Sequence, residues 1–149
     1  MLEFVGHTVI RENHIGDWGT PFGMLIENMV DLGGVDADLT IDLADPSAFY
    51  KQARAKFDAS DEFKERARER VVRLQSRSDD ETMALWKALV AQSTRHFNEV
   101  YDKLGILLTD ADLAGESMYQ PLMPSVLERL ETAGLLEESD GAKVRAHIA

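Results

Sequence analysis

Eleven residues near the N-terminus constrain the fold of this chain more than any other stretch. Residues 13–23 read Asn-His-Ile-Gly-Asp-Trp-Gly-Thr-Pro-Phe-Gly, with three glycines beside a carboxylate, an imidazole and an indole. Glycine allows the backbone to turn at positive φ and lets another group approach it closely. Residues 7–14 alternate between apolar and polar, and apolar residues at helical spacing follow the glycines. The pattern predicts a strand, a loop and a helix, with a ligand site on the loop.

The helix after this loop is predicted from residue 20 to about residue 32, and it ends near Gly33-Gly34. Thr20 can cap it, and Pro21 suits its first position because the missing N–H of proline would be unpaired there. Residues 2–6, ahead of the strand, read as the last turn of another helix that ends at Gly6. The predicted helix has one apolar stripe, formed by Phe22, Leu25, Ile26, Met29 and Val30.

Three more helices are predicted in the middle of the chain. One opens at Asp45-Pro46, the next is capped by Ser60, and the longest runs over residues 79–104 with Gly105 as its stop. The first of them carries Phe49, Tyr50, Ala53 and Phe57 at helical spacing. The buried side of the longest is expected to hold Met83, Trp86, Leu89, Val90, Phe97, Val100, Tyr101 and Leu104.

The helix after Ser60 carries a charged run, residues 61–70, with acids in its first turn and bases later. Side chains four residues apart, Glu62 with Arg66 and Glu69 with Arg73, add support to the helix. We interpret the run as a solvated face without a function of its own.

Short elements are predicted near the C-terminus. Residues 106–108 suit a short strand, residues 121–133 a helix that ends at Gly134, and residues 135–144 a hairpin that turns at Asp140-Gly141. Residues 35–43 are acidic and irregular. The chain is therefore expected to be an α-rich α/β protein, in which the most buried side chains are Val9, Phe22, Leu25, Trp86, Leu89, Phe97 and Leu127.

Composition excludes several classes of protein. The chain has 149 residues, enough to bury a core, and no cysteine for disulfides or thiolate chemistry. The spacing of the four histidines, at positions 7, 14, 96 and 147, fits no metal site. A net charge of −11 repels phosphate, so strong nucleic-acid binding by the chain alone is not expected. The sequence shows neither a membrane span nor a secretory signal, and a cytoplasmic protein is expected.

The glycine-rich segment resembles a signature of class I arginyl-tRNA synthetases, Asn-His-x-Gly-Asp-Trp-Gly-x-Gln-Phe-Gly. The likeness continues over residues 2–142. Eight segments match that family in the same order: residues 2–11, 13–23, 48–51, 72–75, 85–87, 100–105, 115–117 and 138–142.

The resemblance implies a partial catalytic domain, from a fragment or a truncated paralogue of a synthetase of this family. Residues 1–34 would form a βα fragment of a Rossmann-like nucleotide-binding fold, and residues 35–149 a mainly helical connecting insertion with a small strand pair, together one compact unit. The family binds ATP through a His-x-Gly-His signature and a Lys-Met-Ser-Lys type loop, and residues 1–149 contain neither. We therefore expect ATP, with magnesium, and tRNA to act only in the full-length family, and the isolated chain to bind no cofactor and to be inactive.

The resemblance also implies an arginine pocket. A guanidinium is matched best by a carboxylate that accepts two parallel hydrogen bonds, and the family likeness assigns this role to Glu116. Asn13, His14, Asp17 and Trp18 are assigned to the floor of the same pocket, although packing between helix and strand is the simpler role for Trp18.

Two departures from the family leave other functions open. The family usually has glutamine where this chain has Pro21, and the tail 143–149 is basic where the family continues as an apolar strand. One alternative is a stand-alone module that binds arginine, another guanidino compound or a protein partner. Another is an excised domain with no independent role.

Overall fold

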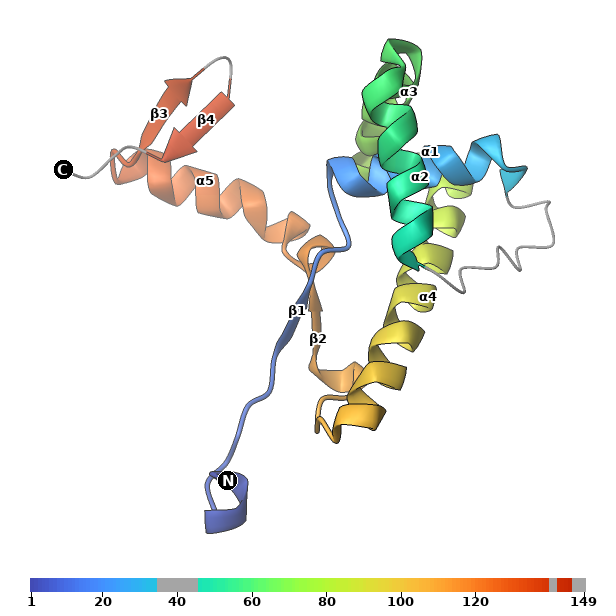
Figure 1. Ribbon diagram of the computed structural model, residues 1–149. Coiled ribbons are helices and arrows are strands. Elements are labelled where there is room, and N and C mark those ends of the chain that lie inside the picture. Colours follow the sequence, from blue (N-terminus) through green and yellow to red (C-terminus); the bar gives the residue numbers. More distant parts are fainter. Residues whose placement is uncertain (35–45, 140–141, 146–149) are drawn as a thin grey trace.

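The computed structural model describes residues 1–34, 46–139 and 142–145. Within these ranges a bundle of helices forms one side of the molecule (Figure 1). An extended N-terminal arm leads to a short parallel strand pair beside the bundle, and a helix with a hairpin projects from the other side of that pair. The predicted α-rich α/β class is confirmed.

The bundle contains four helices: α1 (Thr20–Asp31), α2 (Pro46–Ala59), α3 (Asp61–Ser76) and α4 (Asp80–Leu104). Its main core joins side chains from all four, with Ile26, Leu74 and Leu85 completely buried. Helix α1 packs closely on α3 at Gly23, where an added Cβ would lie 2.4 Å from the Ala67 carbonyl oxygen. The absence of a side chain at Gly23 therefore allows the backbones of α1 and α3 to lie close together.

The helix boundaries follow the predicted caps. The Ser60 hydroxyl accepts a hydrogen bond from the Phe63 N–H at 3.2 Å, as expected of an N-cap. Asp79 precedes α4, and Gly105 ends it at φ 65°. Helix α1 differs by one residue, because Gly19 occupies its N-cap and Thr20 is already helical. Gly19 has φ 80° and ψ −164°, a conformation that glycine adopts most readily.

The parallel strand pair joins β1 (Asn13–Ile15) to β2 (Leu113–Gly115). Asn13 lies opposite Leu113 and Ile15 opposite Gly115. The predicted strand over residues 7–14 is therefore wrong in its bounds. Residues 7–12 are extended but pair with no strand among the described residues, so alternation alone did not make them a strand.

The C-terminal part contains α5 (Met123–Thr132) and an antiparallel hairpin of β3 (Leu136–Ser139) and β4 (Ala142–Arg145). Both elements are confirmed, whereas the turn predicted at residues 140–141 lies outside the described residues. The strand predicted at residues 106–108 is wrong: the segment is irregular, and the strand follows at Leu113 after a short 3-10 helix (Asp110–Asp112). The acidic segment 35–43 is also outside the described residues.

Burial departs from the sequence pattern both inside and outside the bundle. Phe22 and Leu89 are buried as predicted, whereas Val9, Leu25, Trp86, Phe97 and Leu127 are only half-buried. On α4 the predicted stripe extends too far, because Val100 and Leu104 are exposed near its C-terminal end. The C-terminal end of α4 extends beyond the other helices of the bundle (Figure 1).

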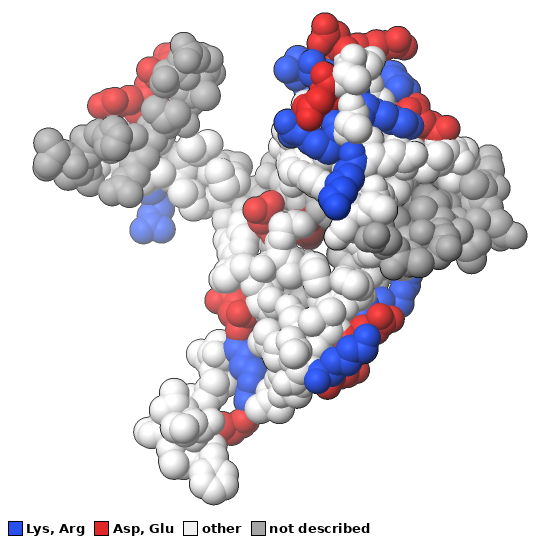
Figure 2. All heavy atoms as spheres, viewed as in Figure 1, with Lys and Arg blue, Asp and Glu red and all other residues white. Residues whose placement is uncertain are grey.

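Charged side chains are unevenly distributed over the molecule (Figure 2). In this view they gather over α3 and along the flank of α4, whereas most of the N-terminal arm is uncharged. The arm exposes Leu2, Phe4, Val5 and Ile10. Within the described ranges, no helix is long and apolar enough to cross a membrane.

Candidate functional site

The predicted site residues lie where the two parallel strands end. Because Ile15 pairs with Gly115, the segment after β1 meets the segment after β2. Ligands of open α/β sheets bind outside the carboxyl ends of parallel strands. The predicted nearness of Glu116 to the loop after Asn13 is confirmed, although about a hundred residues separate them in sequence.

Asp17 joins the two segments. Its carboxylate is buried and accepts two hydrogen bonds from Ser117, at 2.8 Å from the backbone N–H and at 2.6 Å from the hydroxyl. A Cβ on Gly115 would lie 2.4 Å from the Asp17 Oδ2 atom, so only glycine fits beneath the carboxylate. The carboxylate of Asp17 thus fixes the backbone on both sides of Glu116.

Two tryptophans attach this loop to the bundle: Trp18 belongs to the loop, and Trp86 belongs to α4. Trp18 is buried in the main core and meets Trp86 edge-to-face, with 5.7 Å between the ring centroids. The Trp86 Nε1–H donates a hydrogen bond of 2.7 Å to the carbonyl oxygen of Asp17. The guanidinium of Arg77 lies 5.9 Å from the centre of the Trp18 ring. Trp18 therefore has the packing role that its residue type suggested.

Three predicted site residues remain accessible. Glu116 and His14 are exposed, and Asn13 is half-buried. The Asn13 Nδ2 atom donates a hydrogen bond to the Tyr101 hydroxyl at 3.0 Å. These are the side chains that can contact a ligand from solvent.

A second acidic group borders the accessible residues. The His14 Nε2 atom lies 3.6 Å from a carboxylate oxygen of Glu12, and the Tyr119 hydroxyl donates to Glu12 at 3.2 Å. Desolvation, together with this hydrogen bond to Glu12, raises the pKa of the Tyr119 phenol above its ordinary value. Tyr119 therefore stays a hydrogen-bond donor at neutral pH.

A cleft of about 240 Å³ lies beside the loop, lined by residues of α1, α2 and α4. Its walls are mostly apolar and include Ile15, Phe22, Leu89 and Phe97, together with Pro21. The residue that departs from the family pattern therefore borders a space beside the site loop. No cluster of three or more metal-ligating side chains occurs in the described part of the chain.

Sequence reasoning missed two residues that hold the site together. Ser117 and Trp86 both lie inside segments that resemble the family, but neither carried a signal for its contact with Asp17. Ser117 is separated from Asp17 by 100 positions. The pairing of β1 with β2 brings Ser117 and Asp17 together.

The comparisons with known proteins fit this arrangement. A family described as tRNA synthetases class I (R), catalytic domain, matches residues 1–147. The chain therefore belongs to this family of class I synthetase catalytic domains, as its resemblance predicted.

The similar proteins are named arginine–tRNA ligases. The chain is 54% identical to the arginine–tRNA ligase of Thermobifida fusca (strain YX) over 142 residues, which are 95% of this chain and 24% of that protein. It is 48% identical to the arginine–tRNA ligase of Hahella chejuensis (strain KCTC 2396) over 143 residues, covering 95% and 25%. The chain thus spans about a quarter of the length of the curated relatives it matches.

The fold agrees with the sequence comparison. A crystal structure of arginyl-tRNA synthetase from Plasmodium falciparum superimposes with a TM-score of 0.74 at 27% identity. The superposition covers 98% of this chain and 24% of that one. The likeness thus extends over both the bundle and the strand side of the molecule.

Proposed function

We propose that these 149 residues form the arginine-recognising segment of an arginyl-tRNA synthetase catalytic domain. In the whole enzyme the reaction is the ATP-dependent attachment of arginine to tRNA. The observation that carries the proposal is the link from Asp17 to Ser117, which holds Glu116 at the carboxyl ends of two parallel strands. We also propose that residues 1–34 and 35–149 are the two parts of one compact unit.

In this proposal Glu116 binds the guanidinium of arginine. Its carboxylate is exposed, whereas the backbone on either side of it is fixed by Gly115 and Ser117. Because its backbone is already fixed, only the side chain of Glu116 has to be ordered when it accepts the two parallel hydrogen bonds of a guanidinium. The chain's net charge of −11 also favours a cationic ligand.

The other predicted residues divide into two roles. Asn13 and His14 are accessible and contact the ligand beside Glu116. Asp17 and Trp18 are buried and support the loop from beneath, because both oxygens of the Asp17 carboxylate already accept hydrogen bonds from Ser117. The assignment of all five to an arginine pocket remains a prediction.

Residues 1–149 alone are proposed to be inactive. Activation of an amino acid requires donors that neutralise the charge developing on the α-phosphate of ATP, and the loss of such donors costs orders of magnitude in rate. The two family signatures that bind ATP with magnesium are not among residues 1–149. Residues 1–149 are therefore proposed to supply the arginine-binding part of the active site and not its ATP-binding part.

Calorimetric titration of the chain with arginine tests the proposal. Arginine is expected to bind, Glu116→Gln to remove binding, and Glu128→Gln, which changes an exposed glutamate of α5, to leave it intact. Lysine serves as the ligand control, because a single ammonium cannot make the paired hydrogen bonds of a guanidinium. Equal binding of arginine by the Glu116→Gln variant would contradict the assignment.

A second candidate function is a protein-binding module, and the exposed N-terminal arm favours it. Phe4 is 93% exposed and Ile10 is 91% exposed. Contiguous exposed apolar surface marks sites of interaction with other polypeptide surfaces. If the chain binds no arginine, this candidate remains and the arginine pocket does not.

A further inference from the structure

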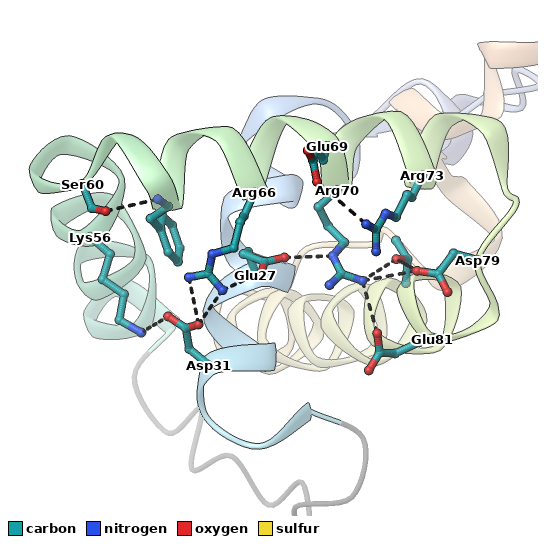
Figure 3. A network of polar contacts seen from close by, with 12 residues as sticks. Glu27, Asp31, Lys56, Ser60, Arg66, Glu69, Arg70, Arg73, Asp79 and Glu81 are labelled. Atoms are coloured by element: carbon teal, nitrogen blue, oxygen red, sulfur yellow. Dashed lines mark hydrogen bonds and ion pairs between the residues drawn. The ribbon is translucent and has the colours of Figure 1, made fainter.

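A cluster of charged side chains with a buried pair at its centre lies in the bundle, outside the candidate site (Figure 3). Arg70 of α3 and Glu27 of α1 are both buried and form an ion pair, with 2.9 Å between Nε and Oε2. Arg70 also donates to the Thr82 hydroxyl of α4 at 2.8 Å. Sequence reasoning placed this charged run on a solvated face, which is wrong for Arg70 because its partner lies 43 positions away.

The cluster continues on both sides of Arg70. The Nη1 atom of Arg70 lies 3.3 Å from carboxylate oxygens of Asp79 and Glu81, at the start of α4. On the other side, Arg66 donates to Glu27 and to Asp31, both at 3.0 Å. Arg70 is the member of this cluster that contacts both α1 and α4.

A sequence of contacts leads from Arg70 to the site. Thr82 is completely buried, and Trp86 follows it after one turn of α4. Trp86 donates to the carbonyl oxygen of Asp17, whose carboxylate holds Ser117. Each contact joins a different pair of elements, so a shift of the start of α4 is transmitted to the backbone beside Glu116.

We infer that Arg70 is a positioning residue for the candidate arginine site, acting through Thr82 and Trp86 on the Asp17–Ser117 link. The inference rests on the proposed function for its ligand, but the geometry that it describes is independent of the ligand. Arg70 does not contact the ligand. It fixes the α4 turn that holds the Asp17 loop, and so the direction in which Glu116 is presented.

The test uses the native-state NMR signal of the Ser117 amide proton, which lies against the Asp17 carboxylate. Arg70→Met and Trp86→Phe are each expected to shift this signal upfield, because the hydrogen bond of 2.8 Å lengthens. Arg73→Met is the matched control: Arg73 is exposed, three positions along the same helix, and lies 3.8 Å from Glu69. It is expected to leave the Ser117 signal unchanged.

This readout separates positioning from general stabilisation. A residue that only stabilises the bundle changes the folded fraction and leaves the chemical shift of folded Ser117 where it was. If Arg70→Met does not fold, Thr82→Val removes the hydrogen bond from Arg70 to Thr82 and keeps the Arg70–Glu27 pair. An unchanged Ser117 signal in folded Arg70→Met, or in Thr82→Val where that variant replaces it, overturns the inference.

Arginine titration of the same variants connects the inference to function. Arg70→Met and Trp86→Phe are expected to weaken arginine binding roughly twofold to thirtyfold, the range in which substitutions along such networks change coupling between sites. If the wild-type chain binds no arginine, the proposed function fails, while the Ser117 signal still decides the role of Arg70. If arginine binds wild type and both variants equally, the inference fails and the proposed function stands.

Discussion

The helical bundle and the strand side of this molecule differ in how they are stabilised. The bundle of α1 to α4 contains the completely buried side chains Ile26, Leu74 and Leu85 and an ion pair that is itself buried. The strand side holds β1, β2 and α5, and it exposes large apolar side chains such as Ile10, Leu107 and Met118. The accessible candidate site residues belong to the strand side, and the groups that fix their backbone reach it from the bundle.

This difference explains how the short strand pair of the candidate site is held in place. Two strands of three residues each cannot form a stable unit alone, because isolated strand pairs are marginal in water. The contacts of Trp18 and Trp86 attach the strand pair to a bundle that has its own core. The packing of the loop against the helices therefore makes the site rigid.

The largest expected effect tests the buried ion pair of the bundle. Glu27→Gln removes one partner and leaves the charge of Arg70 buried, which typically costs about 3–5 kcal/mol. Glu69→Gln, which removes an exposed ion pair from the same helix as Arg70, is expected to cost less than about 1 kcal/mol. Chemical denaturation of both variants at neutral pH gives the two values, and similar values would remove the distinction between them.

Matched leucine truncations compare the two regions directly. Leu85→Ala empties a completely buried position in the bundle and is expected to cost about 2–5 kcal/mol. Leu107→Ala changes a side chain that is 71% exposed on the strand side and is expected to stay within about 0.5 kcal/mol. Urea denaturation measures both. A large cost for Leu107→Ala would mean that the strand side has a core of its own.

The contact between α1 and α3 provides a smaller effect. Gly23→Ala places a methyl group 2.4 Å from both the Ala67 carbonyl oxygen and Val71, and such overpacking costs about 1–3 kcal/mol. Gly16→Ala is the control, because a Cβ there meets no atom within 4 Å. Thermal unfolding should separate the two variants, and equal melting temperatures would show that the helices can move apart without loss.

The smallest expected effect is the pH dependence of stability that Asp79 contributes. The hydroxyl of Thr82 and the charge of Arg70 lower the pKa of the Asp79 carboxyl below its usual value. A lowered folded-state pKa stabilises the fold above the unfolded pKa of about 3.9, and this stabilisation is lost as the pH falls through the folded value. Asp79→Asn is therefore expected to reduce the free energy of unfolding at pH 7. The variant is also expected to lose less of that free energy than wild type does between pH 5 and pH 2. Denaturation at those pH values checks this, and an unchanged acid profile would contradict it.

The bundle could be predicted from sequence because its signals are local. Apolar spacing located α1 and α4, and Ser60 and Gly105 marked helix ends where the structure has them. The strands could not be predicted in the same way. Leu113, Ala114 and Gly115 show no periodicity that marks a strand, and they form one because Asn13, His14 and Ile15 lie beside them.

The residues of the loop indicated a ligand site by themselves, but the part that Glu116 has in it was predictable only through family likeness. Asp17 and Glu116 were assigned to one pocket by resemblance, and the pairing of β1 with β2 brings their segments together. The burial of Arg70 was not predictable, because a charged run on one helix does not reveal a glutamate on another. Local sequence thus specifies the helices, and tertiary contacts specify the site.

Arginine-dependent exchange of pyrophosphate into ATP tests the central claim most directly. We propose that residues 1–149 recognise arginine and that ATP is activated by family signatures outside them. The purified chain is expected to show no exchange above the protein-free background at saturating arginine, ATP and magnesium. Measurable exchange that Glu116→Ala abolishes would contradict the account, because it would require ATP to be bound and activated by side chains of this chain.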